Sequence, residues 1–171
     1  MQAFADWIAT TPVNAFLAGI GWSVPALQTT HILAIAVIFS SVVMISMRVL
    51  GWTGQEQTMD QTMRRFAPWF WGALVVLAVT GFFMIVIEPV RELMALSFWI
   101  KMGLLIVGLA AAISFQRHVR GNAVLYDGQA ASRGAIRVWA LSLLVLWTAI
   151  IFMGRFIAYD PQIWGPWSPI N

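Results

Sequence analysis

Four long apolar stretches limit the folds that are open to this chain. They lie at about 25–47, 66–87, 96–115 and 136–158, and each holds the roughly 20 residues that a helix needs to cross a bilayer. In lipid every backbone polar group needs a partner within the protein, so stretches of this length cross a membrane as α-helices. We therefore predict an all-α integral membrane protein with a single domain, built as an up-down bundle of four transmembrane helices.

The composition points to lipid as the environment of the chain. Of the 171 residues, 60% are hydrophobic and only 10% are charged, whereas a soluble domain carries about 25% charged residues. We therefore predict the lipid bilayer as a partner. The net charge of +3 does not indicate nucleic-acid binding, because the basic residues are confined to particular loops. The absence of cysteine excludes disulfides, iron–sulfur clusters, thiolate–zinc sites and covalently attached c-type haem.

The first 23 residues do not resemble a cleavable signal peptide. They contain no lysine or arginine, they carry Asp6, and Thr10-Thr11-Pro12 interrupts them. Two short amphipathic pieces, at 4–8 and 13–20, are typical of helices that lie in the membrane interface. We predict that residues 1–23 form an interfacial N-terminal segment packed against one end of the bundle.

The arginines predict the orientation of the bundle. The connections after the first and third stretches carry most of them: Arg48, Arg64, Arg65, Arg117, Arg120, Arg133 and Arg137. The connection at 88–95 carries one arginine, flanked by acidic residues, and residues 1–23 and 159–171 carry acidic charges alone. Cytoplasmic loops are enriched in lysine and arginine. We therefore predict two cytoplasmic loops, with the N-terminus and the C-terminal tail at 159–171 both periplasmic.

Four side chains with the chemistry of a site share one predicted depth. His31 lies near the start of the first stretch, and Lys101, the only lysine, lies near the start of the third. These two helices run in the same direction, whereas Met84 and Arg155 approach the same level on the helices that return. Ionisable residues inside a membrane are costly, so they mark candidate functional sites. We predict that His31, Met84, Lys101 and Arg155 converge near the outer surface.

The second histidine lies elsewhere. His118 follows Lys101 by 17 residues, or about 25 Å along a helix, and it stands between Arg117 and Arg120 at the cytoplasmic edge. The two histidines are therefore not positioned to coordinate one metal ion from opposite sides. This placement excludes a four-histidine arrangement for two haems and a multi-histidine copper or zinc site. A single inward histidine suits one axial bond to haem iron, with a cation available for the propionates.

Each member of this polar set also has a simpler explanation. Lys101 and Arg155 can extend to the interface, as long cations near helix ends do. His31 can hydrogen-bond a neighbouring helix with the help of the polar residues at 28–30. Met84 can simply fill the core, because methionine adapts to irregular space. The residues alone leave these alternatives open.

Several short motifs resemble those of a bacterial family of four-helix membrane proteins of unknown function. They are Thr30-His31-Ile32-Leu33, Met47-Arg48-Val49-Leu50-Gly51, Ala67-Pro68-Trp69 with Thr80-Gly81, Phe98-Trp99-Ile100-Lys101-Met102 and Gly154-Arg155-Phe156-Ile157-Ala158-Tyr159. The resemblance extends over nearly the whole chain. It implies a multi-pass protein of the bacterial inner (cytoplasmic) membrane.

That family is similar in turn to the copper-resistance protein D-like superfamily, which includes the four-helix membrane protoporphyrinogen oxidase. The oxidase binds haem b, and its functional set has a histidine early in the first helix and a lysine early in a later one. His31 and Lys101 match these positions in kind and order. The resemblance thus implies haem b, with His31 as the candidate axial ligand, Met84 or Lys101 as second ligand or neighbour, and Arg155 with Lys101 near the propionates.

The chain also departs from these relatives. The run that ends the first stretch, Arg48-Val49-Leu50-Gly51-Trp52, lacks the further histidine found there in the oxidase. This difference bears on the oxidase activity more than on haem binding. The periplasmic motifs rich in methionine and histidine that a copper importer would carry are missing as well.

Three functions are consistent with these features. The favoured one is a haem b-binding protein that transfers electrons between a membrane quinone pool and a periplasmic redox protein. The second is a non-catalytic subunit or transporter, in a larger complex or a homo-oligomer, with His31 and Lys101 as a polar pair or an ion path. The third is an oxidase-like enzyme in which these two residues handle substrate carboxylates and protons.

Overall fold

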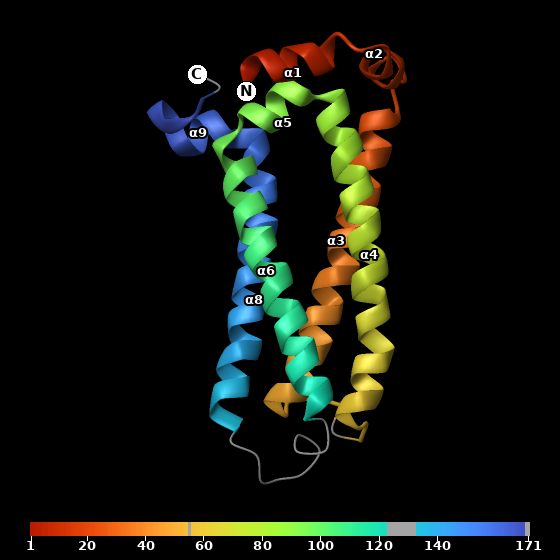
Figure 1. Ribbon diagram of the computed structural model, residues 1–171, viewed down its shortest axis with the longest axis vertical. Helices are drawn as coiled ribbons and strands as arrows, with labels where there is room; N and C mark the ends of the chain where they lie inside the picture. Colours follow the sequence, from red (N-terminus) through yellow and green to blue (C-terminus); the bar gives the residue numbers. More distant parts are fainter. Residues whose placement is uncertain (55, 123–132, 170–171) are drawn as a thin grey trace.

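The computed structural model describes residues 1–54, 56–122 and 133–169, and the chain folds as an all-α bundle of four long helices. These helices are α3 (Ser23–Leu50), α4 (Met59–Ile87), α6 (Leu96–Gly121) and α8 (Arg133–Phe156). Each is long and apolar enough to cross a membrane. Consecutive long helices run in opposite directions along the bundle (Figure 1). The predicted fold class is confirmed.

Two of the helix boundaries differ from the sequence prediction by more than one turn. Helix α4 begins at Met59 and not near 66, because Thr58 and Gln61 form a capping box that satisfies the first backbone N–H groups. Helix α6 continues past 115 to Gly121, so that His118 lies on its last turn. Helix α3 stops where predicted to within a turn, since Gly51 adopts the left-handed conformation, with φ of 80°.

Short helices gather at one end of the bundle. They are α1 (Gln2–Ala9), α2 (Pro12–Ala18), α5 (Pro89–Met94), η1 (Ile157–Tyr159), α9 (Asp160–Trp164) and η2 (Gly165–Trp167). The connection at 88–95 contains α5, which the sequence analysis did not predict and which begins at Pro89, a residue suited to a first helical turn. The N-terminus and the last described residues of the chain, 165–169, lie at this end (Figure 1), which we call the α5 end. Residues 51–54 and 56–58 mark the opposite, or loop, end.

The four long helices associate as two pairs. Helix α3 packs most extensively against α4, and α6 packs against α8. The pairs are joined mainly by contacts between α3 and α8, while α4 and α6 touch only slightly. The pairs approach each other toward the loop end and separate toward the α5 end (Figure 1). The bundle therefore has a closely packed half and a divergent half.

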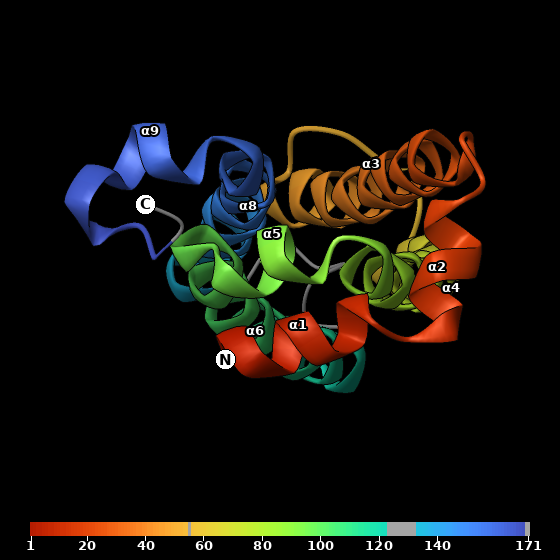
Figure 2. The ribbon, with the colours of Figure 1, turned by 90° about the horizontal axis from the view of Figure 1, so that it is seen from above.

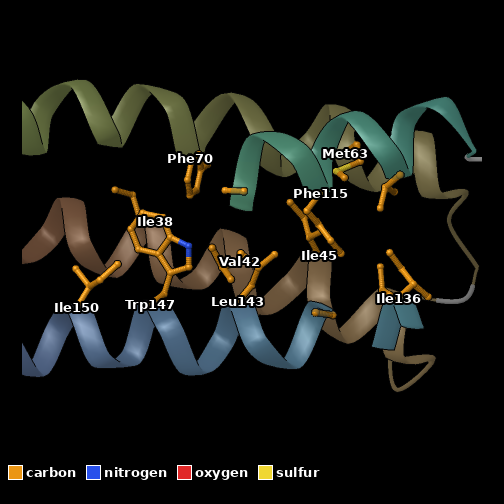
Figure 3. Packing of buried hydrophobic residues seen from close by; sticks show 14 of the residues in the cluster. Ile38, Val42, Ile45, Met63, Phe70, Phe115, Ile136, Leu143, Trp147 and Ile150 are labelled. Carbon is orange, nitrogen blue, oxygen red and sulfur yellow. The ribbon is translucent and has the colours of Figure 1, made fainter. Parts of the chain in front are cut away.

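The main apolar core fills the middle of the bundle and its loop-end half (Figure 3). Phe70 is 1% exposed, and its ring meets the indole of Trp147 edge-on, with centroids 5.3 Å apart. Met63 and Val119 are fully buried. A Cβ on Gly108 would lie only 3.0 Å from a methyl carbon of Ile150, so the glycine allows α6 to approach α8 closely. Close packing of this kind is what holds membrane helices together.

Candidate functional site

A cavity of about 260 Å³ lies within the divergent half of the bundle. Residues of all four long helices and of α5 form its wall. Most of the wall is apolar, as for Ile35, Leu77 and Leu105. The structure places all four residues singled out in the sequence on this one wall: His31, Met84, Lys101 and Arg155. Antiparallel helices thus bring together side chains that lie far apart in the chain.

A hydrogen bond to α4 holds His31 in place. Its side chain is buried, and Nδ1 lies 2.8 Å from the hydroxyl of Thr80. That hydroxyl donates its one hydrogen to the carbonyl of Val76 at 2.8 Å, so it accepts from the Nδ1–H of His31. The hydrogen-bond network therefore assigns the tautomer that leaves the lone pair on Nε2. Among the residues that the structure describes, Nε2 has no hydrogen-bond partner.

The partner of His31 differs from the sequence-based alternative. The polar residues at 28–30 do not hydrogen-bond the imidazole: Thr29 and Thr30 are exposed, and the hydroxyl of Thr30 donates to the carbonyl of Ala26 at 2.9 Å. Gly81, next to Thr80, lets the ring lie close to α4, since a Cβ there would be 3.5 Å from Cε1 of His31.

Lys101 approaches the cavity from α6 and lies against α8. A Cβ on Gly154 would lie 3.5 Å from both Cε and Nζ of Lys101, so the glycine makes room for the lysine. Among the described residues, no hydrogen bond or ion pair within bonding distance holds the ammonium group. Its electrostatic partner is the carboxylate of Glu92. A half-buried cation without a direct ligand is a group that an anionic ligand would satisfy.

Helix α5 adds two charged residues to the cavity wall. Glu92 is 6% exposed, and its Oε1 lies 3.5 Å from Nη2 of Arg91. The same guanidinium contacts Oε2 of Glu88 at 2.6 Å. Burial raises the pKa of the Glu92 carboxyl, and the positive charges of Lys101 and Arg91 oppose that rise. The α5 end of the cavity is therefore a mixed-charge environment in which cations are in excess.

Arg155 and Met84 complete the predicted set in different ways. Arg155 is exposed, and its guanidinium lies 5.3 Å from the ring centroid of Tyr159, with Nη2 3.4 Å from the tyrosine oxygen. This cation–π contact keeps the charge at the edge of the cavity. Met84 is half-buried and presents a thioether on the α4 side of the wall.

His118 does not belong to this site. It is exposed on the last turn of α6, and its ring lies 5.7 Å from that of Trp139. It does not line the cavity, so the structure does not bring the two histidines together. Within the described ranges, no group of three or more His, Cys, Asp or Glu side chains could hold a metal ion.

Three residues that line the cavity, or that hold a lining residue in place, were not predicted from the sequence. Thr80 was noted within a motif but not as the partner of His31, although a hydroxyl in an apolar helix is a signal for a polar contact. Glu92 was considered only as a charge in the connection at 88–95, because α5 was not predicted. Trp147 lines the cavity with 3% exposure, and its indole N–H has no partner among the described residues.

The region that matches a known family includes both the helical bundle and the cavity. The model of a family of unknown function, DUF6644, matches residues 4–160. The chain belongs to this family. A search of curated proteins and a search of solved structures each gave no match. The DUF6644 match includes every residue that lines the cavity, and the likeness to the copper-resistance protein D-like superfamily stays a prediction.

Proposed function

We propose that this DUF6644 protein binds haem b in the cavity and serves as an electron-transfer protein of the bacterial inner membrane. The observation that carries the proposal is the state of His31. Its Nδ1 lies 2.8 Å from the hydroxyl of Thr80, and its Nε2, on the wall of a mostly apolar cavity, has no hydrogen-bond partner among the residues that the structure describes. Haem-ligating histidines need this arrangement, in which one ring nitrogen is fixed by an outer hydrogen bond and the other binds the metal.

The other side chains on the wall suit the same cofactor. Haem presents an apolar macrocycle and two carboxylates, and the cavity combines apolar walls with cations near the α5 end. Lys101 and Arg155 would pair with the propionates. Met84 offers a thioether on another helix as a possible second ligand. The donor set therefore fits haem b.

The volume of the cavity limits how much of the haem it can enclose. A cavity of about 150 Å³ holds one benzene molecule, and a porphyrin is several times larger than benzene. The 260 Å³ of this cavity would therefore enclose only part of the macrocycle. Ile32, which lines the cavity, is 63% exposed, so the wall reaches the surface of the bundle. We expect the remainder of the macrocycle to border lipid at this surface.

The residues of the chain would set the properties of the cofactor. Bound haem supplies reversible one-electron chemistry. Thr80 would fix the orientation of the His31 ring and strengthen it as a ligand. The apolar wall would keep water away, and the cations would neutralise the carboxylates; both properties tune a reduction potential.

The arrangement of charges supports a direction for the electron path. The exposed arginines Arg64, Arg65, Arg117 and Arg120 lie toward the loop end, which favours a cytoplasmic location for that end. The α5 end would then face the periplasm. Exposed aromatic residues on α1 and α2, such as Trp7 and Phe16, support an interfacial position for these helices. A quinone in the membrane and a periplasmic redox protein would be the two partners.

A titration of the purified protein with haemin tests the proposal. Wild type and the matched control His118→Ala are expected to bind one haemin per chain with a shifted Soret band. His31→Ala should weaken binding by about 100-fold or more, since it would remove the side chain that holds the iron. Equal binding by His31→Ala, or no saturable binding by wild type, would overturn the proposal. A pigment-free wild type that copurifies with a partner would favour the non-catalytic subunit, and rescue of a strain lacking protoporphyrinogen oxidase would favour the enzyme.

A further inference from the structure

The cavity that holds His31 reaches the lateral surface of the bundle. His31 is 8% exposed, whereas Ile32, the next residue on α3, is 63% exposed and lines the same cavity. On the opposite side, Arg155 and Ala158 are exposed and line it too. Exposed residues on α3, and on the end of α8 with the η1 turn that follows it, therefore form the two rims of one opening.

The surrounding helices leave this side of the bundle uncovered. Figure 2 shows α5 and α1 crossing the end of the bundle on the side of α4 and α6, while none of the described helices crosses between α3 and α8. The two helix pairs separate toward the α5 end (Figure 1), so the gap between α3 and α8 widens where the cavity lies. The opening thus faces the lipid beside the bundle, and we call it the α3–α8 portal.

The portal has an amphipathic character. Its rims carry apolar side chains, Ile32 and Ile151, and a single cation at one edge, Arg155. Tyr159 holds that cation in place through its ring and its hydroxyl. Behind it, Lys101 offers a second cation without a direct ligand among the described residues. Such a slot is complementary to a molecule with an apolar body and an anionic head.

We propose that the ligand of the cavity is a membrane-borne amphiphile with an anionic head, which enters and leaves through the α3–α8 portal directly from the lipid. The apolar body would pass between α3 and α8, and Arg155 and then Lys101 would receive the anionic group. The proposal rests on the proposed function only where it identifies this amphiphile as haem. The lateral route itself depends on the shape and chemistry of the opening.

A probe that contains no haem tests the portal separately. The chain has no cysteine, so Ile32→Cys can carry a single fluorophore, and Ile106→Cys on α6 is a matched control that is 68% exposed and does not line the cavity. The probe is stearic acid bearing a nitroxide quencher, added to proteoliposomes, with its methyl ester for comparison. We expect saturable quenching at residue 32 by the acid, weaker quenching by the ester, and non-saturable quenching at residue 106. Equal, non-saturable quenching at both positions would overturn the portal.

Two further changes separate the route from the head-group contact. Arg155→Gln should lower the affinity for the acid, measured as the concentration that gives half-maximal quenching, by about tenfold, because one charge-assisted contact is lost. The affinity for the ester should be unchanged. Ala158→Trp, which adds bulk to the rim, should slow haemin uptake from loaded liposomes about tenfold, with affinity nearly unchanged. Uptake at the wild-type rate in Ala158→Trp would contradict the lateral route. A wild type that binds the nitroxide acid saturably but binds no haemin would retain the portal and reject the proposed function.

Discussion

The two halves of the bundle use the same four helices for different purposes. In the loop-end half the helices meet closely, and residues such as Met63 and Val119 are fully buried. In the α5-end half the pairs separate around a mostly apolar cavity whose wall also carries charged side chains. Lipid tails are as apolar as the helix surfaces, so close contact, and not apolar burial as such, stabilises a membrane bundle. The difference indicates that stability is concentrated in one half, which allows the other half to carry a costly polar site.

The largest expected effect is a packing defect in the closely packed half. Phe70→Ala removes a ring that is 1% exposed and contacts Trp147, so it should lower the free energy of unfolding by about 3 kcal/mol. The smaller change Ile35→Ala, on the cavity wall at the margin of the main core, should cost about 1 kcal/mol because it removes fewer contacts. Unfolding in detergent micelles measures both. Equal losses would contradict the assignment of stability to the loop-end half.

A polar connection, in contrast, is expected to secure the α5-end half. The buried carboxylate of Asp160 accepts hydrogen bonds from the backbone N–H groups of Leu96 and Ser97, at 3.1 and 2.8 Å, and from the hydroxyl of Ser168, at 2.7 Å. It thereby caps the first turn of α6, the helix that carries Lys101. Asp160→Ala should cost about 2 kcal/mol, since several buried donors lose their acceptor.

An exposed aspartate provides the control for this change. Asp60 pairs with Arg64 at 2.8 Å, but the two side chains are 50% and 80% exposed. Asp60→Ala should therefore change the melting temperature very little. A melting temperature for Asp160→Ala as high as that of Asp60→Ala would show that the C-terminal segment does not secure α6.

A smaller effect is expected from the residue that orients His31. Thr80→Val keeps the shape of the side chain but removes the acceptor of the Nδ1–H bond. It should weaken haemin binding about tenfold, as outer hydrogen-bond partners of metal ligands do. Thr80→Ser retains a hydroxyl and should bind almost as well as wild type. Equal haemin affinities of the valine and serine variants would show that the Thr80 hydroxyl does not orient His31 for binding.

The smallest expected effect is a dependence of stability on pH in the α5-end half. Burial raises the pKa of Glu92 above its ordinary value of 4.5, so the folded protein holds this proton more tightly than the unfolded chain. The resulting stabilisation is fully present below 4.5 and is lost as the pH rises through the pKa of the folded state. Glu92→Gln should flatten this part of the profile of melting temperature against pH. A profile unchanged by the substitution would indicate that Glu92 titrates normally.

Most of the architecture, but only part of the site, could be predicted from the sequence. Stretches of about 20 apolar residues are enough to predict four crossing helices, and alternating direction is enough to bring His31 and Lys101 to one level. Rotation about each helix axis was not predictable, because nearly uniform apolarity leaves no polar face to orient it. The contact between His31 and Thr80 depends on that rotation. Glu92 was missed for a different reason, since a helix as short as α5 gives little periodic signal.

The most direct test of the central claim is a visible spectrum of the protein purified from its own membranes, oxidised and then reduced. The account predicts a Soret band that shifts on reduction and sharp bands of reduced haem b. These features should be lost in His31→Ala and retained in Thr80→Ser and His118→Ala. A wild-type protein without haem, or a haem spectrum that persists unchanged in His31→Ala, would contradict the assignment of this cavity as a haem site.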